Sequence, residues 1–387
     1  MPDLIGLPLQ TMFAEVEQRS LDAEFDETYP ENGSFSKRER NGQHYWYYNG
    51  YDRQTGAKYV KYAGPAQDEA VTQRVERFQR IKTDFRARRR MITALKAAGL
   101  PAPDPLVGEV VEALARAGAF RLRCVLVGTA AYQTYAGLLG VLLPTPTLMT
   151  TDIDVAQFHA ISLLVEDSLP PILEVLRAVE PGFAEIPDQA GGRFATRFRA
   201  QGIEVEFLTP NRAGDEHQGK PAPMPALGGA AATPLRFLDY LIHEPVRSVL
   251  LHKAGVPVRV PAPERYAVHK LIVATRRRSD HHGQTKRDKD VHQAGVLIDA
   301  LAATRRQHDL LDAWMEAWDR GPKWQAALVR GRAMLRPEHQ SALRQALERA
   351  GRETGDRLED IGFATTAGIV PPIPAADDEA VEDADGV

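Results

Sequence analysis

The sequence predicts a mixed α/β fold, with a small β meander and a basic helix before it and a helical domain after it. Between residues 119 and 235, short apolar segments of strand length alternate with segments of helical periodicity, which is typical of an α/β unit with a mixed sheet. From residue 236 to about 352 the helical period dominates. In residues 43–64, aromatic residues flank Asn49-Gly50 and Thr55-Gly56, which are turn signals.

Residues 1–66 form the first expected region, and its main feature is the aromatic meander. In the interpretation that we favour, the tyrosines pack a small sheet, because small sheets need large side chains to bury enough area. In the alternative, exposed aromatic rings and basic residues form a stacking platform for nucleic-acid bases. The residues concerned are Tyr45, Tyr47, Tyr59 and Tyr62, with Arg53, Lys58 and Lys61 beside them.

Residues 67–118 form a basic helical segment. From Asp68 to about Leu100, apolar residues recur at helical spacing, and seven arginines lie largely off that stripe. Such a run is usually a solvated face, although it can also contact a phosphate backbone. The apolar residues are Val71, Val75, Phe78 and Phe85, and the arginines are Arg74, Arg77, Arg80, Arg86, Arg88, Arg89 and Arg90.

The remaining chain divides into three regions. Residues 119–235 contain the α/β unit, with strands expected at "RLRCVLVG", "TDIDVAQ", "RFATRFRAQ" and "IEVEFLTP". Residues 236–352 form the helical domain. Residues 353–387 are proline-led and acidic, and we expect them to be a disordered tail because they lack large apolar residues.

The composition bounds the classes of protein to consider. The 387 residues carry a net charge of −4, which is too small to indicate a general nucleic-acid or membrane binder. A single cysteine, Cys124, lies in an apolar run and fits a reducing compartment. No secretory signal or membrane-spanning run is evident, so we expect a cytoplasmic protein without a membrane partner.

Two aspartates interrupt an otherwise apolar strand in "TTDIDVA". Asp152 and Asp154 are two residues apart, so they share one face of the strand. At an effective dielectric constant near 20, two negative charges about 7 Å apart repel by about 2.4 kcal/mol. Solvent, a basic partner or bound divalent cations can offset this repulsion. The third possibility makes the pair a magnesium site, since Mg²⁺ prefers carboxylate oxygens and leaves coordination positions for substrate phosphates.

A third carboxylate and a glycine turn complete the candidate site. In "GIEVEFLTP", Glu204 and Glu206 alternate with apolar residues and share the face opposite the core. Either Glu204 or Glu206 can be the third ligand. Three acidic ligands are enough for two Mg²⁺ ions. In "VLVGT", Gly128 and Thr129 end a strand and begin a helix, where backbone N–H groups can bind phosphate.

Lys270 stands out in the helical domain because it lies within the apolar stretch "YAVHKLIVA". A buried ammonium group is costly unless an anion meets it. The alternative is that its aliphatic stem lets the charged group reach solvent.

These residues together resemble the nucleotidyltransferase superfamily of DNA polymerase β. Its members carry a strand ending in Gly and a small residue, then a helix, then an acidic-apolar-acidic-apolar strand and a later acidic residue. The matching positions are Gly128 and Thr129, Asp152 and Asp154, and Glu206. Threonine replaces the usual second Gly or Ser, and the spacer before Asp152 is longer than typical.

The helical domain extends the resemblance, which covers about residues 120–300. "PERYAVHKLIVATRRR" and "KRDKDVHQAGVLIDAL" are similar to the lysine and basic-acidic motifs of a bacterial group with this fold, related to abortive-infection nucleotidyltransferase toxins. This implies a nucleotidyltransferase palm in residues 119–235. It also implies that Lys270 faces the triphosphate and that Lys289 and Asp290 belong to the nucleotide-binding site.

The implied activity is Mg²⁺-dependent transfer of a nucleoside monophosphate from an NTP to a hydroxyl acceptor, with release of pyrophosphate. The acceptor is RNA, such as a tRNA end, or a protein. Asp152 and Asp154 would hold two metal ions, Glu206 would hold the nucleophile-side ion or act as general base, and Gly128, Thr129 and Lys270 would hold the triphosphate. The second hypothesis is a non-catalytic nucleic-acid-binding module or toxin-antitoxin component that retains the fold.

Overall fold

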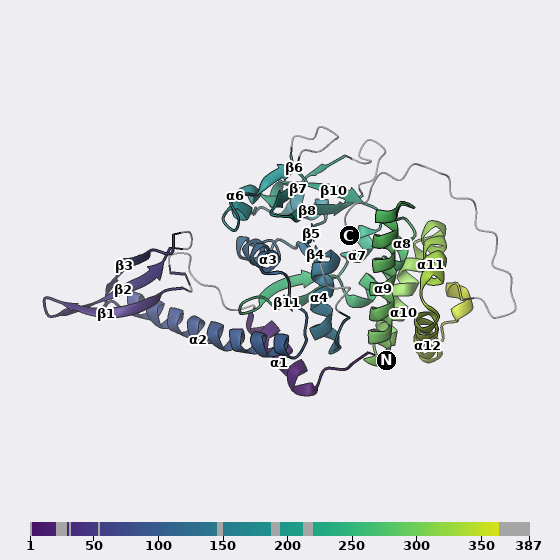
Figure 1. Cartoon of the computed structure of the whole chain (residues 1–387), viewed down its shortest axis with the longest axis horizontal. Coiled ribbons are helices and arrows are strands. Elements are labelled where there is room, and N and C mark those ends of the chain that lie inside the picture. The colour runs from purple at the N-terminus through teal and green to yellow at the C-terminus, as the bar shows by residue number, and fades with distance from the viewer. Residues whose placement is uncertain are drawn as a thin grey trace.

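The computed structural model describes residues 2–20, 29–30, 32–52, 55–144, 150–186, 194–211 and 220–363, without the side chain of His282. Figure 1 shows an arm, formed by a β meander and a long helix, that projects from a larger body. The arm consists of β1 (Ser34–Arg40), β2 (Gln43–Tyr51), β3 (Lys58–Pro65) and α2 (Glu69–Ala97). The meander and the basic helix expected from the sequence are therefore present, with β1 as an additional strand.

The body is centred on a mixed seven-stranded sheet. The order is β4-β5-β8-β10-β9, and β7 pairs with β8 and with β6. β5 is parallel to β8, and β8 to β10, whereas the other pairs in this sheet are antiparallel. The bounds are β4 (Val125–Val127), β5 (Asp152–Ala156), β6 (Ala184–Ile186), β7 (Arg197–Ala200), β8 (Ile203–Pro210), β9 (Ala222–Pro223) and β10 (Ala231–Leu235). This mixed sheet confirms the predicted α/β architecture.

Short helices connect the strands, and the apolar side chains of the sheet pack into one large core. Ile153 and Val155 of β5 are fully buried, and α3 and α4 contact this strand. Burial of the alternate apolar positions leaves the acidic positions on the opposite face. The helices are α1 (Leu7–Ser20), α3 (Pro105–Ala117), α4 (Gly128–Leu139), α5 (His159–Leu164), α6 (Ile172–Arg177), η3 (Pro225–Leu227) and α7 (Leu238–Leu241).

The C-terminal part of the body is helical, but it also contains the hairpin β11 (Val246–Leu250) and β12 (Val256–Val260). The expectation of an almost wholly helical region missed this hairpin. Its alternating valines are buried on the body side, and Gly255 (φ +91°) closes the turn. The helices are α8 (Pro263–Ala274), α9 (His281–Ala303), α10 (Gln307–Asp319), α11 (Pro322–Met334), α12 (Pro337–Thr354) and η4 (Leu358–Ile361).

The predicted acidic tail lies mostly outside the described residues, which end at Phe363. Within residues 353–363, η4 packs against α10 and α12. The indole N–H of Trp314 donates a hydrogen bond of 3.0 Å to the carbonyl oxygen of Ile361. None of the helices in the described part of the chain is both long and apolar enough to cross a bilayer.

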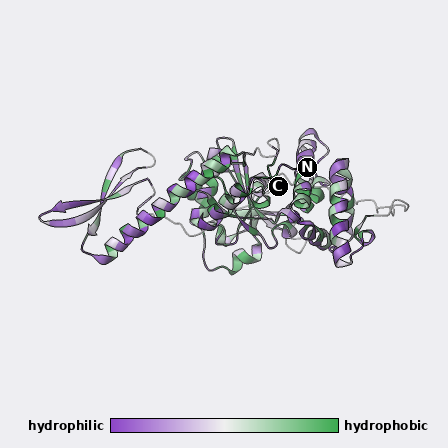
Figure 2. Ribbon diagram, turned by 90° about the horizontal axis from the view of Figure 1, so that it is seen from below, coloured by the Kyte–Doolittle hydropathy of each residue, from purple (hydrophilic) through white to green (hydrophobic). Residues whose placement is uncertain are grey.

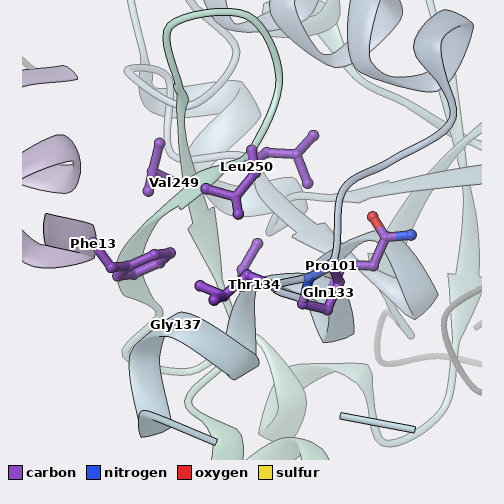
Figure 3. Close-up of a pocket in the computed structure, with 9 residues that line it drawn as sticks. Phe13, Pro101, Gln133, Thr134, Gly137, Val249 and Leu250 are labelled. Atoms are coloured by element: carbon purple, nitrogen blue, oxygen red, sulfur yellow. The ribbon is translucent and has the colours of Figure 1, made fainter. Parts of the chain in front are cut away.

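α1 closes the body beside α4 and β11. Figure 3 shows Phe13 of α1 next to Gly137 and Thr134 of α4 and to Val249 and Leu250 of β11. A Cβ atom at Gly137 would lie only 2.1 Å from the Phe13 ring, so the glycine permits this close approach. The crevice between these residues has no room for a water molecule, so it is a packing feature and not a ligand site.

Candidate active site

The acidic residues of β5 and β8 meet on one face of the sheet. In the parallel pairing of the two strands, Asp152 lies opposite Glu204 and Asp154 opposite Glu206. Asp152 is exposed at the start of β5, whereas Asp154 and Glu206 are only 6% and 7% exposed. Burial and the Asp152 charge raise the pKa of Asp154 to about 6, and burial and the Asp154 charge raise the pKa of Glu206 to about 8.

The two glutamates of β8 have different partners. Glu204 accepts hydrogen bonds from Arg199 (2.5 Å from Nη2) and lies 3.5 Å from Nη1 of Arg197. Glu206 accepts one hydrogen bond of 2.8 Å from the hydroxyl of Thr233. Arginine already compensates the charge of Glu204, while Glu206 faces Asp154 across the strand pair. These contacts favour Glu206 over Glu204 as a metal ligand.

Gly128 brings the start of α4 against the acidic pair. It has φ +63°, and a Cβ atom there would lie 2.2 Å from Oδ2 of Asp154. Both the backbone conformation and the close approach therefore require glycine. The Tyr266 hydroxyl of α8 donates a hydrogen bond of 3.0 Å to the Gly128 carbonyl oxygen. This hydrogen bond from α8 fixes the backbone at Gly128. The following residue, Thr129, lines the cavity.

Lys270 meets a carboxylate and does not reach solvent along its stem. It is 2% exposed, and its ammonium nitrogen lies 2.8 Å from Oδ1 of Asp290 on α9. Arg277 donates from Nε to the other oxygen of Asp290, also at 2.8 Å. Burial lowers the pKa of Lys270, and Asp290 opposes this shift. Asp290 therefore fixes two cations side by side at the junction of α8 and α9.

These groups line one cavity of about 340 Å³ between the sheet and the α8–α9 pair. Every site residue expected from the sequence lines it except Gly128, which lies close to the Asp154 side chain. The sheet side carries most of the carboxylates, with Arg197 and Arg199 paired to Glu204, and the helix side carries most of the cations, with Asp290 between two of them. Such an arrangement suits a triphosphate with bound cations. The lining residues are Thr129, Thr150, Asp152, Asp154, Arg197, Arg199, Glu204, Glu206, Lys270, Arg277, Lys286, Lys289, Asp290 and Gln293.

The sequence reasoning missed Lys286 and Gln293 as site residues. Positions 286, 289, 290 and 293 have the spacing i, i+3, i+4 and i+7, which places them on one face of α9. Because Lys289 and Asp290 were already candidates, this spacing could have extended the site by two residues. Arg197 and Arg199 carried no comparable signal, since their place in the cavity depends on the pairing of β7 with β8.

A second group of possible metal ligands lies outside this cavity. Glu109, Glu112 and His252 hold ligand atoms within 4.8 Å of one another. Lys253 donates to both glutamates, at 2.5 and 2.7 Å, so an ammonium group already compensates their charge. Asp152, Asp154 and Glu206 line their cavity without such close mutual spacing of all three.

A mixed sheet whose acidic face opposes a basic helix pair is the arrangement expected of a nucleotidyltransferase. Comparison with known proteins agrees. The model of a protein family described as "Nucleotidyltransferase" matches residues 105–319, more than half of the 387 residues, and the chain belongs to this family. The match contains the sheet, the α8–α9 pair and all the cavity residues.

Comparisons with solved structures and with curated proteins add little to the family match. A crystal structure of an antigenic nucleotidyltransferase-like protein from Paracoccidioides brasiliensis is similar over 63% of this chain and 94% of that chain, at 16% sequence identity and a TM-score of 0.36. No curated protein matches the sequence.

Proposed function

We propose that this protein is a Mg²⁺-dependent nucleotidyltransferase that transfers a nucleoside monophosphate from an NTP to a hydroxyl group of RNA or protein and releases pyrophosphate. The supporting observation is where its buried charges lie. Among the described residues, five Asp, Glu, Lys and Arg side chains are buried, and four of them line one cavity. Burying charge costs folding free energy, so such a concentration in a cavity points to function.

The acidic wall fits divalent cations. Asp152, Asp154 and Glu206 would hold Mg²⁺, because hard cations prefer carboxylate oxygens. Bound Mg²⁺ would neutralise charge on the triphosphate and on the departing pyrophosphate. Burial and the neighbouring carboxylates raise the pKa values of Asp154 and Glu206, and bound divalent cations would oppose these shifts. Glu206 is also the candidate general base for the attacking hydroxyl group.

The basic wall fits the triphosphate. Lys270, Lys289 and Arg277 would contact phosphate oxygens, with Lys286 of the same α9 face beside them. The Thr129 hydroxyl and the backbone at the start of α4 would add contacts near Gly128. Asp290 would act through its ion pairs, by holding Lys270 and Arg277 in place. This makes Asp290 a positioning residue of the nucleotide site.

The test is label transfer. Purified protein is incubated with each α-labelled NTP, Mg²⁺, and total bacterial RNA or protein, and the products are separated on a gel. We expect label on an RNA or protein band, and its loss on addition of EDTA and in the Asp152→Ala/Asp154→Ala variant. Absence of label with every NTP from a folded protein, or equal labelling by the double variant, would contradict the proposal.

A matched pair tests the third ligand. Glu206→Gln and Glu204→Gln replace a carboxyl group with an amide of the same shape at alternate positions on one face of β8. We expect Glu206→Gln to lower the transfer rate by at least about 100-fold, a typical effect for removal of a catalytic electrostatic group. Glu204→Gln should keep most activity, because its charge is already paired with arginine. The reverse ranking would assign the role to Glu204.

A further inference from the structure

The three-stranded meander of the arm has two unlike faces. One face packs on α2: Phe35 and Tyr48 contact Phe78 with ring centroids 5.1 and 5.8 Å apart. Tyr48 is fully buried there, and Tyr59 packs beside it. These residues form the small core that holds the meander on the helix. The interpretation that tyrosines pack a minor sheet therefore holds for this face.

The opposite face carries a second set of aromatic rings, the partly exposed Tyr45 and Tyr47 and the exposed Tyr62. Ser36 pairs with Tyr47, Arg38 with Tyr45, and Tyr47 with Tyr62, so these side chains alternate with the packed set. Tyr62 is 53% exposed. Its ring centroid lies 6.0 Å from that of Tyr45 and 5.6 Å from that of Tyr47. We call this surface, with Arg38 and Arg40, the tyrosine face.

The tyrosine face lies in the most basic part of the chain. Residues 29–97 contain fifteen Lys and Arg against seven Asp and Glu, a formal charge of +8 in a protein with a net charge of −4. Figure 2 shows the meander and the first half of α2 standing clear of the body and largely hydrophilic. Arg38 lies 5.0 Å from the centroid of the Tyr47 ring. Exposed rings and guanidinium groups therefore share one surface.

The exposed arginines of α2 add to this charge. In the part of the chain that the structure describes, no carboxylate forms an ion pair with any of six of them. These are Arg74, Arg77, Arg80, Arg86, Arg89 and Arg90. The seventh, Arg88, is 3% exposed and bonds to Asp84 and to the Ala254 carbonyl oxygen, so it belongs to the packing of the arm on the body.

We propose that the tyrosine face binds single-stranded RNA, with bases stacked on Tyr45, Tyr47 and Tyr62 and phosphates contacted by Arg38 and Arg40. Aromatic rings on an open sheet stack unpaired bases, and basic side chains follow the backbone. Duplexes do not offer their base faces to such a surface. That the bound RNA is also the nucleotide acceptor rests on the proposed function, whereas the binding itself does not.

Polar groups on the same face favour RNA over DNA. The Ser36 hydroxyl accepts a hydrogen bond of 2.9 Å from Asn49, which leaves its own proton free to donate. Asn49 also accepts a hydrogen bond of 3.0 Å from Arg38. Such groups between the rings can bind a ribose 2′-hydroxyl, which DNA lacks.

The test is fluorescence anisotropy with the full-length protein and a labelled 12-nucleotide RNA of mixed sequence. Tyr47→Leu/Tyr62→Leu keeps apolar bulk but removes the planar rings, and we expect it to weaken binding by about 10-fold or more. Tyr47→Phe/Tyr62→Phe keeps the rings and should bind within about 3-fold of the unmodified protein. Circular dichroism and thermal unfolding check that both variants fold.

Charge has its own matched control. Arg38→Ala/Arg40→Ala should weaken binding and flatten its salt dependence, whereas Arg349→Ala/Arg352→Ala, the same charge change on exposed positions of α12, should not. Equal binding by the Leu and Phe variants would overturn the stacking proposal. Equally tight binding of DNA of the same sequence would overturn the assignment of RNA, and tighter binding of duplex RNA would overturn single-stranded recognition.

RNA binding by the tyrosine face and nucleotide transfer in the cavity can be tested independently. Asp152→Ala/Asp154→Ala should bind the RNA as tightly as the unmodified protein while losing transfer. If RNA binds the tyrosine face but no label is transferred, the proposed activity is wrong and the RNA site stands. If label is transferred and the Leu variant still binds RNA normally, the tyrosine face is not the RNA site.

Discussion

The arm and the body place their charge in opposite ways. Residues 29–97 carry a formal charge of +8, and the rest of the chain carries −12. In the arm nearly all of this charge is exposed, and Arg88 is the one buried cation among its described residues. In the body, Asp154, Glu206, Lys270 and Asp290 are buried around one cavity. Water stabilises the exposed charges, whereas other side chains of the protein contact the buried ones.

This difference separates two kinds of recognition. Exposed charges on a small sheet attract a flexible polyanion at little cost to folding, but salt screens them. Buried charges destabilise the fold unless they are paired, and they act strongly on a ligand because little water screens them. The two regions should therefore respond differently to substitution, with large effects on chemistry and stability in the body and small local effects in the arm.

The largest expected effect is that of Asp154→Asn. It should lower the rate of transfer by at least about 1,000-fold, since one metal ligand is lost. It should also stabilise the metal-free protein by about 3 kcal/mol, because the raised pKa of Asp154, about 6, means that its ionised form destabilises the fold at neutral pH. Urea unfolding in EDTA measures the second effect. A destabilised variant would show that Asp154 is held by contacts and is not poised for a cation.

Gly128→Ala should lower transfer by about 100-fold through displacement of Asp154, because the added Cβ would lie 2.2 Å from its Oδ2 atom. The matched control is Gly202→Ala in the turn before β8. Gly202 also has a positive φ, +80°, but a Cβ atom there meets nothing within 4 Å. Both variants carry backbone strain, so a loss of transfer confined to Gly128→Ala isolates the contact with Asp154. Equal losses would assign the effect to strain alone.

The sequence predicted the acidic half of the site better than the basic half. Alternation in "DIDV" and "IEVEF" requires only that apolar residues face the core, which puts Asp152, Asp154 and Glu206 on one face of the sheet. The partner of Lys270 lies twenty residues away on another helix, and local periodicity does not specify how α8 packs on α9. The resemblance marked both Lys270 and Asp290 but not the ion pair between them.

The hairpin β11–β12 shows a second limit. "VRSVLLHKAGVPVRV" contains alternating valines, but a short apolar segment is compatible with either a strand or a buried helix. Its identity is decided by packing, since β12 contacts β4 and β11 contacts α1 and α4. The same holds for Arg88, which shares an exposed-looking run with Arg89 and Arg90 and is buried only because α2 packs against the turn at Ala254.

Asp290→Asn should destabilise the protein by about 3 kcal/mol, because Lys270 and Arg277 would be left in a buried site without their anion. Asp167→Asn is the matched control, since it breaks the exposed pair with Arg121 and should leave the unfolding midpoint unchanged. Denaturant unfolding measures both. Similar unfolding midpoints for Asp290→Asn and Asp167→Asn would contradict this. They would mean that the buried ion pair of Lys270 and Asp290 contributes no more to stability than the exposed pair does.

In the arm, Arg88→Met should cost about 2 kcal/mol through loss of its bonds to Asp84 and to the Ala254 carbonyl oxygen. Arg89→Met, on the next and exposed position, removes the same charge and should have no measurable effect. We expect hydrogen exchange to increase in the second half of α2 and at the β11–β12 turn, with Mg²⁺ and NTP binding unchanged. Faster exchange at α8 and α9 would show that the arm and the body unfold together.

The effect that is smallest at neutral pH comes from His269 on α8, because it develops only as the pH falls. Burial and the neighbouring Lys270 lower the pKa of its imidazole to about 3, against an ordinary value of 6.5. Between these values the unfolded chain binds a proton that the folded chain does not, so stability falls as the pH drops below 6.5, by up to about 1.4 kcal/mol per pH unit. His269→Gln should flatten the dependence of stability on pH between 6.5 and 4, whereas His281→Gln, at the exposed start of α9, should leave it unchanged. Because the carboxylates of the cavity gain protons in the same range and act in the opposite direction, the difference between the two variants carries the test. If stability depends on pH in the same way in His269→Gln and His281→Gln, His269 also takes up its proton in the folded state. Burial would then not keep its imidazole neutral beside Lys270.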